Sequence, residues 1–181
     1  MPQNYELLKT QRLDLHCLTV EELFEMGFKD NLFENRTFEN PHQIIAGEKL
    51  PRTNRVADVR ERPENIKWYY RIIVDRERNL AVGSVSFHGA PNKDGMLEIG
   101  IGIAEAERGQ GFASEALIGM WNWAANQPRV KLLRYTVSPS NAASMAIIKK
   151  FEFPNIGEQT DEEDGLELIY EISVSDYLDW L

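Results

Sequence analysis

The alternation of hydrophobic and polar positions is clearest from Trp68 onward. Residues 68–75 (WYYRIIVD), 80–89 (LAVGSVSFHG) and 96–103 (MLEIGIGI) are rich in β-branched and aromatic residues, and short polar turns separate them. This pattern predicts three antiparallel strands. The period then becomes helical over 112–127, where one apolar stripe is formed by Ala116, Leu117, Met120, Trp121 and Ala124.

The rest of the C-terminal half continues to alternate between strand and helix patterns. Residues 131–137 (KLLRYTV) predict a buried strand, 140–151 (SNAASMAIIKKF) a helix, and 165–172 (GLELIYEI) a closing strand after the acidic turn TDEEDG. Three antiparallel strands followed by helix, strand, helix and strand predict an α/β layer with a mixed sheet.

The N-terminal third is less regular. Leu13, Leu15 and Cys17 alternate with polar residues, which predicts a half-buried strand over 10–18. The Thr19 to Glu22 spacing indicates a capping box at the start of a short helix. Residues 29–65 contain three prolines and little periodicity, so we expect a loop on the substrate side there, with a short helix over 42–49.

Length and composition fit one domain over residues 1–181. The net charge is −9, from 29 acidic and 20 basic residues, and no run of Lys or Arg is present that could follow a nucleic-acid backbone. An acidic surface attracts cationic ligands, but it also serves solubility alone. The sequence has one cysteine and three scattered histidines, so neither a disulfide nor a metal site is expected.

Targeting signals are also not apparent in the sequence. The N-terminus has no basic segment followed by an apolar one, and no run of hydrophobic residues is long enough to cross a bilayer. We therefore expect a cytoplasmic protein with no membrane partner.

Glycine is concentrated in residues 98–117 (EIGIGIAEAERGQGFASEAL), which hold Gly100, Gly102, Gly109 and Gly111 of the 12 glycines in the chain. In the third strand of the meander, Glu98, Gly100 and Gly102 share a face that is otherwise bare. Glycine in a strand accompanies the close approach of a ligand or of another backbone. Tight packing of a helix on this face would explain the pattern equally well.

The next segment, ERGQGFASEA, joins a strand to a helix. Its glycines permit positive φ, its first helical turn leaves N–H groups without intrahelical partners, and Arg108 adds a positive charge. These features predict a phosphate site, although a turn of this kind often binds nothing. A Walker A loop and a dinucleotide-binding fingerprint are both absent.

Three segments in order resemble the GNAT superfamily of acyl-CoA-dependent N-acetyltransferases. RGQGFA (108–113) matches the family motif Gln/Arg-x-x-Gly-x-Gly/Ala. TQRLDLHCLT (10–19) resembles the Thr-x-Arg-Leu-x-Leu start of the RimJ/RimL-type branch, and VSPSNAASMAIIKKFEF (137–153) resembles its Val-x-Pro-x-Asn-x-x-Ser segment. The resemblance covers about residues 10–172.

The resemblance implies a GNAT fold, with a mixed, mostly antiparallel sheet that splays beside flanking helices. It implies acetyl-CoA as co-substrate, with the pantetheine arm along the main chain of Ile101 to Ile103 and the pyrophosphate on the N–H groups of the turn. The residues implied in cofactor binding are Ile101, Gly102, Ile103, Arg108, Gly109, Gln110, Gly111, Phe112, Ala113, Ser114 and Asn141.

The resemblance also implies a catalytic carboxylate. Glu98 matches the position where many family members carry a glutamate that acts through water, and an amine nucleophile must lose a proton before it attacks. A main-chain N–H at Ile99 or Ile101 would stabilise the tetrahedral oxygen. The purely structural alternative is a strand-end carboxylate that faces solvent or pairs with a neighbour such as Arg71 or Arg134.

One departure concerns the group that protonates the leaving thiolate. Many relatives use a tyrosine seven residues after Asn141, and this chain has Ile148 there. Ser144 is the substitute that the branch offers, unless its hydroxyl bonds its own helix backbone. Another departure is Glu152, where relatives usually have glycine.

The acceptor is less defined than the donor. The resemblance implies a primary amine, either a protein N-terminus or a small molecule, with selectivity set by residues 29–65, the loop 89–95 and the acidic turn 161–164. The protein would be a monomer or homodimer. A GNAT-fold module that binds acyl-CoA without turnover, or transfer to a hydroxyl, are the alternative functions.

Overall fold

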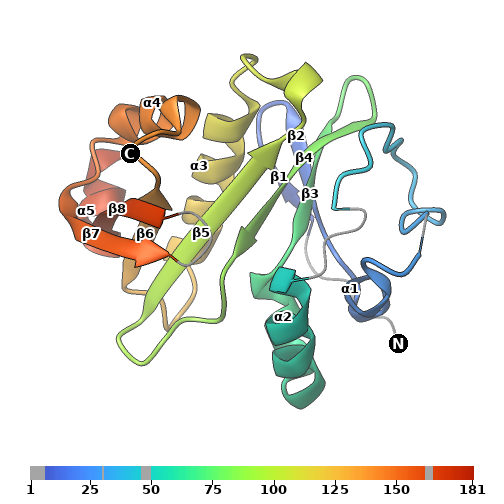
Figure 1. The fold of residues 1–181 in the computed structure, drawn as a ribbon, viewed down its shortest axis with the longest axis horizontal. Helices are drawn as coiled ribbons and strands as arrows, with labels where there is room; N and C mark the ends of the chain where they lie inside the picture. Colours follow the sequence, from blue (N-terminus) through green and yellow to red (C-terminus); the bar gives the residue numbers. More distant parts are fainter. Residues whose placement is uncertain (1–6, 30, 46–49, 162–164) are drawn as a thin grey trace.

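A computed structural model describes residues 7–29, 31–45, 50–161 and 165–181. Its centre is an eight-stranded sheet in the order β1-β2-β3-β4-β5-β6-β8-β7. In Figure 1 the long strand β5 crosses the middle of the molecule, with β1 to β4 on one side and β6, β8 and β7 on the other. The mixed, mostly antiparallel sheet predicted from the sequence is confirmed.

The first five strands pair antiparallel in chain order and the last three add a second group. They are β1 (Leu8–Lys9), β2 (Leu13–Cys17), β3 (Arg71–Asp75), β4 (Leu80–Phe87), β5 (Met96–Ile103), β6 (Leu132–Val137), β7 (Asn155–Asp161) and β8 (Gly165–Ser173). Only β5 and β6 pair in parallel, because α3 connects them across one face. Each of the strands predicted from the sequence is present.

The helices are α1 (Val20–Glu25), α2 (Leu50–Glu61), α3 (Phe112–Ala125), α4 (Ala142–Phe151) and α5 (Val174–Trp180), with 3₁₀ turns at Pro63–Trp68 and Glu105–Glu107. The capping box of α1 is confirmed. Glu22 N donates to Thr19 Oγ1 at 3.1 Å, and Thr19 N donates to Glu22 Oε2 at 2.8 Å.

Two hydrophobic cores cover the two faces of the sheet. The larger core joins α3, α4 and α5 to the sheet, and the predicted stripe of α3 is completely buried in it (Ala116, Leu117, Met120, Trp121 and Ala124, each 0% exposed). Trp121 packs edge-on to Phe151 with ring centroids 4.9 Å apart. The second core joins α1, α2 and the segment between them to β3 and β4.

The N-terminal loop region differs from the expectation. Residues 42–45 form turns, 46–49 lie outside the described residues, and the helix of this region is α2 at Leu50–Glu61. The helix escaped detection because most of its positions are polar. Among its residues whose burial is described, Val56 and Val59 are the buried hydrophobic ones, and Arg55 is buried with them. Pro51 is compatible with the first turn, where a backbone N–H has no partner to lose.

One other boundary was wrong, and two elements, β7 and α5, were missed. The strand expected from Trp68 begins at Arg71, because Pro63 to Trp68 form a 3₁₀ turn. The edge strand β7 has exposed side chains along its whole length, so its sequence NIGEQTD lacks the alternation of a half-buried strand. The short helix α5 begins at the N-cap Ser173, whose Oγ accepts from Asp176 N at 3.1 Å.

The helices of the described residues are all too short or too polar to cross a membrane.

The larger core gives a stability prediction. Trp121 is 0% exposed and contacts Tyr135, Phe151, Phe153 and Tyr177, so Trp121→Ala leaves a cavity that the surrounding rings cannot fill. We expect urea unfolding to show a loss of about 3–5 kcal/mol. The control Ile156→Ala, at a side chain on β7 that is 52% exposed, should stay within about 0.5 kcal/mol of wild type. Equal losses in both variants would contradict this assignment of the core.

Candidate functional site

The sheet opens between β5 and β6. The two strands pair only over Met96–Glu98 and Leu132–Arg134, after which β5 continues along β4 to Ile103 and β6 continues along β8 to Val137. In the described part of the chain, no strand lies beside Ile99–Ile103 on the side that faces β6. This edge of β5 therefore presents main-chain groups that another extended chain can bond.

The turn after β5 leads into the N-terminus of α3. Gly109 has φ +78° and Gly111 has φ +81°, which side chains other than glycine rarely adopt, and Gly111 is the N-cap of the helix. The first hydrogen bond of α3 runs from Glu115 N to Gly111 O at 3.1 Å. The N–H groups of residues 112–114 precede that bond and carry the positive end of the helix dipole.

A cavity of about 450 Å³ lies where the open edge of β5 meets this helix end. Its lining combines three of the predicted segments: the β5 edge, the glycine turn and the start of α4. The lining residues are Ile101, Gly102, Ile103, Glu107, Arg108, Gly109, Gly111, Phe112, Ala113, Ser114, Asn141, Ala143, Ser144, Ile147 and Lys150. The structure thus brings together every predicted cofactor-binding residue except Gln110, together with Ser144.

The cavity has the features that a coenzyme with a pantetheine arm and phosphates requires. The unpaired edge of β5 suits the amides of the arm, and the helix N-terminus suits an anion. Arg108 and Lys150 contribute positive charge to the lining. Arg108 Nε donates to Ile103 O at 3.2 Å, so one carbonyl at the end of this edge already has a partner.

Gln110 is the one predicted cofactor-binding residue that the cavity lining does not include. Its Nε2 donates to Glu107 Oε2 at 3.0 Å and to Glu107 O at 3.3 Å, and the residue does not line the cavity. The Gln110 side chain is therefore part of the support of the turn.

Asn141 and Ser144 lie at the start of α4. Asn141 is the N-cap, and its Oδ1 accepts from Ser144 N at 3.1 Å. The Ser144 side chain lies beside the phenol of Tyr135 on β6. Burial raises the pKa of Tyr135, and the contact with Ser144 opposes this effect. Ile148, at the position of the family tyrosine, is 1% exposed and belongs to the larger core.

Glu98 lies at the last paired position of β5, where the strands begin to separate. Its Oε1 accepts from Thr136 Oγ1 at 2.6 Å and lies 3.5 Å from Nδ1 of His88. The two arginines named as candidate partners of Glu98 have other contacts: Arg134 pairs with Glu171 at 2.7 Å, and the buried Arg71 stacks on Trp123 and donates to Leu15 O.

The glycine face of β5 is open. A Cβ at Gly102 would meet no atom within 4 Å, and one at Gly100 would meet only the ring of His88. Tight packing of a helix is therefore not the reason for these glycines. Close backbone approach does explain Gly83 on β4, where a Cβ would lie 2.2 Å from Gly102 O.

Glu107 is a buried carboxylate beneath the turn. It accepts from Arg78 at 2.6 Å and 3.2 Å, lies 3.1 Å from His42 Nε2, and accepts from Gln110. The bonds from Arg78, followed by those from His42 and Gln110, lower the pKa of Glu107 to about 2. The carboxylate thus fixes the turn to the β3–β4 connection and to residue 42.

Sequence reasoning missed three residues that define the site: Glu107, Thr136 and His88. Glu107 is one acidic residue among several, and its ion pairs join segments that are distant in the chain. The pairing of β4 with β5 could have placed His88 opposite Glu98, since both strands were predicted. His88 N donates to Glu98 O at 2.9 Å.

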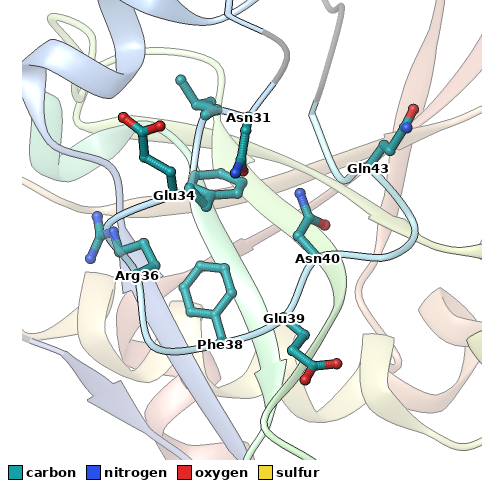
Figure 2. Close-up of a pocket in the computed structure, with 9 residues that line it drawn as sticks. Asn31, Glu34, Arg36, Phe38, Glu39, Asn40 and Gln43 are labelled. Atoms are coloured by element: carbon teal, nitrogen blue, oxygen red, sulfur yellow. The ribbon is translucent and has the colours of Figure 1, made fainter.

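A second hollow, of about 340 Å³, lies within residues 31–43 (Figure 2). Its lining is mostly polar, and Figure 2 shows the side chains of Asn31, Arg36, Phe38 and Asn40 around it. Arg36 is engaged by Glu22 at 2.6 Å and by Cys17 O at 2.9 Å. The residues that line this hollow include neither a helix N-terminus nor an open strand edge, so it lacks the two features of the cavity beside β5.

Within the ranges that the structure describes, no group of three or more His, Cys, Asp or Glu residues is arranged to hold a metal ion.

Comparisons with known proteins agree with this geometry. The model of the family "Acetyltransferase (GNAT) domain" matches residues 15–154. The uncharacterized N-acetyltransferase YjdG of Bacillus subtilis is 30% identical over 82 residues, which is 45% of this chain and 49% of that protein. The match thus spans about half the length of this curated relative.

Solved structures share the fold at low sequence identity. Mutant forms of the spermidine/spermine N-acetyltransferase SpeG from Vibrio cholerae are 18% identical, with a TM-score of 0.63 over 93% of this chain and 97% of that one. RimL, a ribosomal L7/L12 alpha-N-protein acetyltransferase in complex with coenzyme A, is 17% identical, with a TM-score of 0.63 over 93% and 98%.

The Glu107 network predicts an acid-dependent loss of stability. A carboxyl pKa that is lower in the folded than in the unfolded chain stabilises the fold above about pH 4.5, and this contribution disappears as the pH falls toward 2. Glu107→Gln should lose about 1–2 kcal/mol at pH 7, toward the low end because Arg78 is 41% exposed.

Urea unfolding between pH 2.5 and 7 measures this effect. The difference between wild type and Glu107→Gln should narrow below pH 4.5, whereas the exposed neighbour variant Glu105→Gln should follow wild type throughout. A difference that is independent of pH would show that the charge of Glu107 is not what holds the turn.

Proposed function

Because the chain belongs to the GNAT acetyltransferase family, we propose that it transfers an acetyl group from acetyl-CoA to a primary amine by direct attack in a ternary complex. The observation that supports this most is the separation of β5 from β6 beside the N-terminus of α3. An open strand edge and a helix N-terminus in one cavity suit a ligand that is part amide chain and part diphosphate.

The donor site follows from the cavity lining. The main chain of Ile101 to Ile103 would bond the pantetheine amides, and the N–H groups from Gly109 to Ser114 would hold the pyrophosphate with help from Arg108. Asn141 has its Nδ2 available for an amide of the arm, since its Oδ1 caps α4. Bound acetyl-CoA supplies a thioester, whose acyl carbon is the electrophile.

Glu98 is the carboxylate that promotes loss of the proton from the acceptor amine, acting through an intermediary such as water. It lies on the glycine face at the point where the strands separate, and Thr136 fixes its orientation. The Ile99 or Ile101 N–H would stabilise charge on the acyl oxygen. Ser144, which lines the cavity and contacts Tyr135, would donate a proton toward the thiolate in place of the missing tyrosine.

Positioning supplies most of the acceleration in such a reaction. Holding amine and thioester together replaces a bimolecular step and can lower the barrier by about 7–11 kcal/mol. The acceptor is a primary amine on a small molecule or at a protein N-terminus. Proteins of the same fold carry names for acetylation of spermidine or spermine and of ribosomal L7/L12.

The experiment that tests the function combines calorimetry with thiol release. We expect the full-length protein to bind acetyl-CoA and to release free coenzyme A thiol with at least one member of a panel of polyamines, aminoglycosides, amino acids and N-terminal peptides. Binding without thiol release across the panel would favour the alternative of an acyl-CoA-binding module. Absence of binding would overturn the donor site itself.

Ser114→Glu tests the pyrophosphate site. A negative charge in the first turn is compatible with the helix dipole but opposes the anionic diphosphate, so we expect at least tenfold weaker binding of acetyl-CoA, or about 1.4 kcal/mol. Ser175→Glu places the same charge in the first turn of α5, away from the cavity lining, and should bind as wild type does. Calorimetry at one ionic strength measures both; equal affinities would argue against this phosphate position.

Glu98→Gln tests the carboxylate. A positioned base contributes about 10²–10⁴ to the rate, so turnover with a working amine should fall at least tenfold. The fall should be steepest at acidic pH, where the amine is most protonated, while affinity for acetyl-CoA stays unchanged. A variant with wild-type turnover across the pH range would remove Glu98 from the mechanism.

A further inference from the structure

His88 occupies the glycine face of β5 next to Glu98. It follows β4, and its backbone N–H donates to Glu98 O at 2.9 Å, which holds the residue opposite Glu98. The ring Nδ1 lies 3.5 Å from Glu98 Oε1, and the side chain is 51% exposed. One edge of the imidazole thus faces a carboxylate while another part of the ring faces solvent.

The imidazole of His88 fits over β5 because Gly100 has no side chain. A Cβ at Gly100 would lie 3.0 Å from His88 Nε2, which is tighter than most real Cβ contacts. The next position on the same face, Gly102, has no atom within 4 Å of a built Cβ. Nε2 therefore lies over the strand, at the border of the open face that leads along β5 to the cavity.

Glu98 is held in place to receive the other ring nitrogen. Thr136 donates to Glu98 Oε1 at 2.6 Å, and the Glu98 side chain is 18% exposed. A carboxylate only accepts hydrogen bonds, so the neutral ring that suits this pair carries its proton on Nδ1. Nε2 then keeps a lone pair on the open face.

The charges around His88 come from three further elements. Burial is the largest influence and lowers the pKa of His88, and Arg55 on α2 acts in the same direction. Glu98 on β5, together with Glu167 and Asp161 on the β7–β8 hairpin, opposes this effect. The net effect lowers the pKa of His88, which favours the neutral ring, the state that can accept a proton.

We propose that His88 is a catalytic residue that takes the proton from the acceptor amine at Nε2, while Glu98 orients the ring through Nδ1. The inference rests on the proposed acetyltransferase function and assigns the intermediary between amine and Glu98 to a side chain instead of to water alone. It follows from the juxtaposition of His88, Glu98 and Gly100 on the face that β5 leaves open.

The protons balance as follows. The acceptor enters as an ammonium ion and gives one proton to His88 Nε2. The lone pair that this leaves on the amine nitrogen forms the N–C bond to the acyl carbon, and the C–S bond breaks. The second N–H proton of the amine ends on the departing sulfur, which leaves as a thiol. Glu98 stabilises the imidazolium, and the exposed side of the ring returns its proton to solvent, so that one proton is released for each acetyl group transferred.

NMR of the ligand-free protein tests the arrangement without reference to activity. Among the three histidines of the chain, the ¹⁵N signals of His88 are those missing from His88→Gln. We expect the Nδ1–H tautomer when the ring is neutral, a titration midpoint below the ordinary value near 6.5, and a further fall in Glu98→Gln. An Nε2–H tautomer, or a midpoint that Glu98→Gln leaves unchanged, would overturn the proposal.

Kinetics test the catalytic role. His88→Gln should lower turnover at least tenfold, leave acetyl-CoA affinity unchanged and abolish the acid limb of the kcat/KM profile, and imidazole should restore part of the rate of His88→Ala. The control His16→Gln, at a histidine on β2 whose pKa is also lowered, should keep the wild-type profile.

The two failures can be told apart. An active wild type whose His88→Gln variant keeps both rate and pH profile overturns the role of His88 alone. A wild type that releases no thiol with any amine overturns the proposed function, and this role with it.

Discussion

The separation of β5 from β6 is the constraint on which the rest of this structure depends. Three residue pairs hold the strands together, and beyond them each strand follows a different neighbour. A backbone edge without a partner is costly when buried and acceptable where it lines a cavity. The opening therefore determines where a cofactor with an amide arm can bind. It also places Glu98, the last paired residue of β5, at the point where the two strands begin to separate.

The turn between β5 and α3 owes its shape to two different causes. Gly109 and Gly111 permit the backbone conformation, because both have positive φ. Glu107 supplies the support, because Arg78, His42 and Gln110 all converge on its carboxylate. A flexible turn with free N–H groups would lose conformational entropy on binding an anion. Because the Glu107 network orders the turn when the protein folds, that entropy is not lost at the binding step. Residue 42 belongs to the N-terminal segment, so this network also connects that segment to the turn that lines the cavity.

Ile148 stands where many relatives have a tyrosine, and the structure places the Ser144 hydroxyl nearby. The isoleucine is part of the core beneath α4, whereas Ser144, one turn earlier, faces the cavity and contacts the phenol of Tyr135 on β6. A hydroxyl therefore remains near the start of α4, although the helix carries no tyrosine at the family position. His88, which follows β4, and Thr136 on β6 both contact the Glu98 carboxylate, so it lies between groups from the two sides of β5.

The sequence by itself determined the strands and helices with strong periodicity, such as β5 and the buried stripe of α3, because burial on one face leaves a readable period. It also indicated the glycine turn and most of the cavity lining, since these residues lie in three short segments: the end of β5, the turn and the start of α4. Helix α2 and strand β7 were missed because their exposed polar residues carry almost no period. Only the tertiary structure decided the surroundings of Glu98 and Glu107, because their partners are brought together by sheet register and by packing across distant segments, which no local pattern encodes.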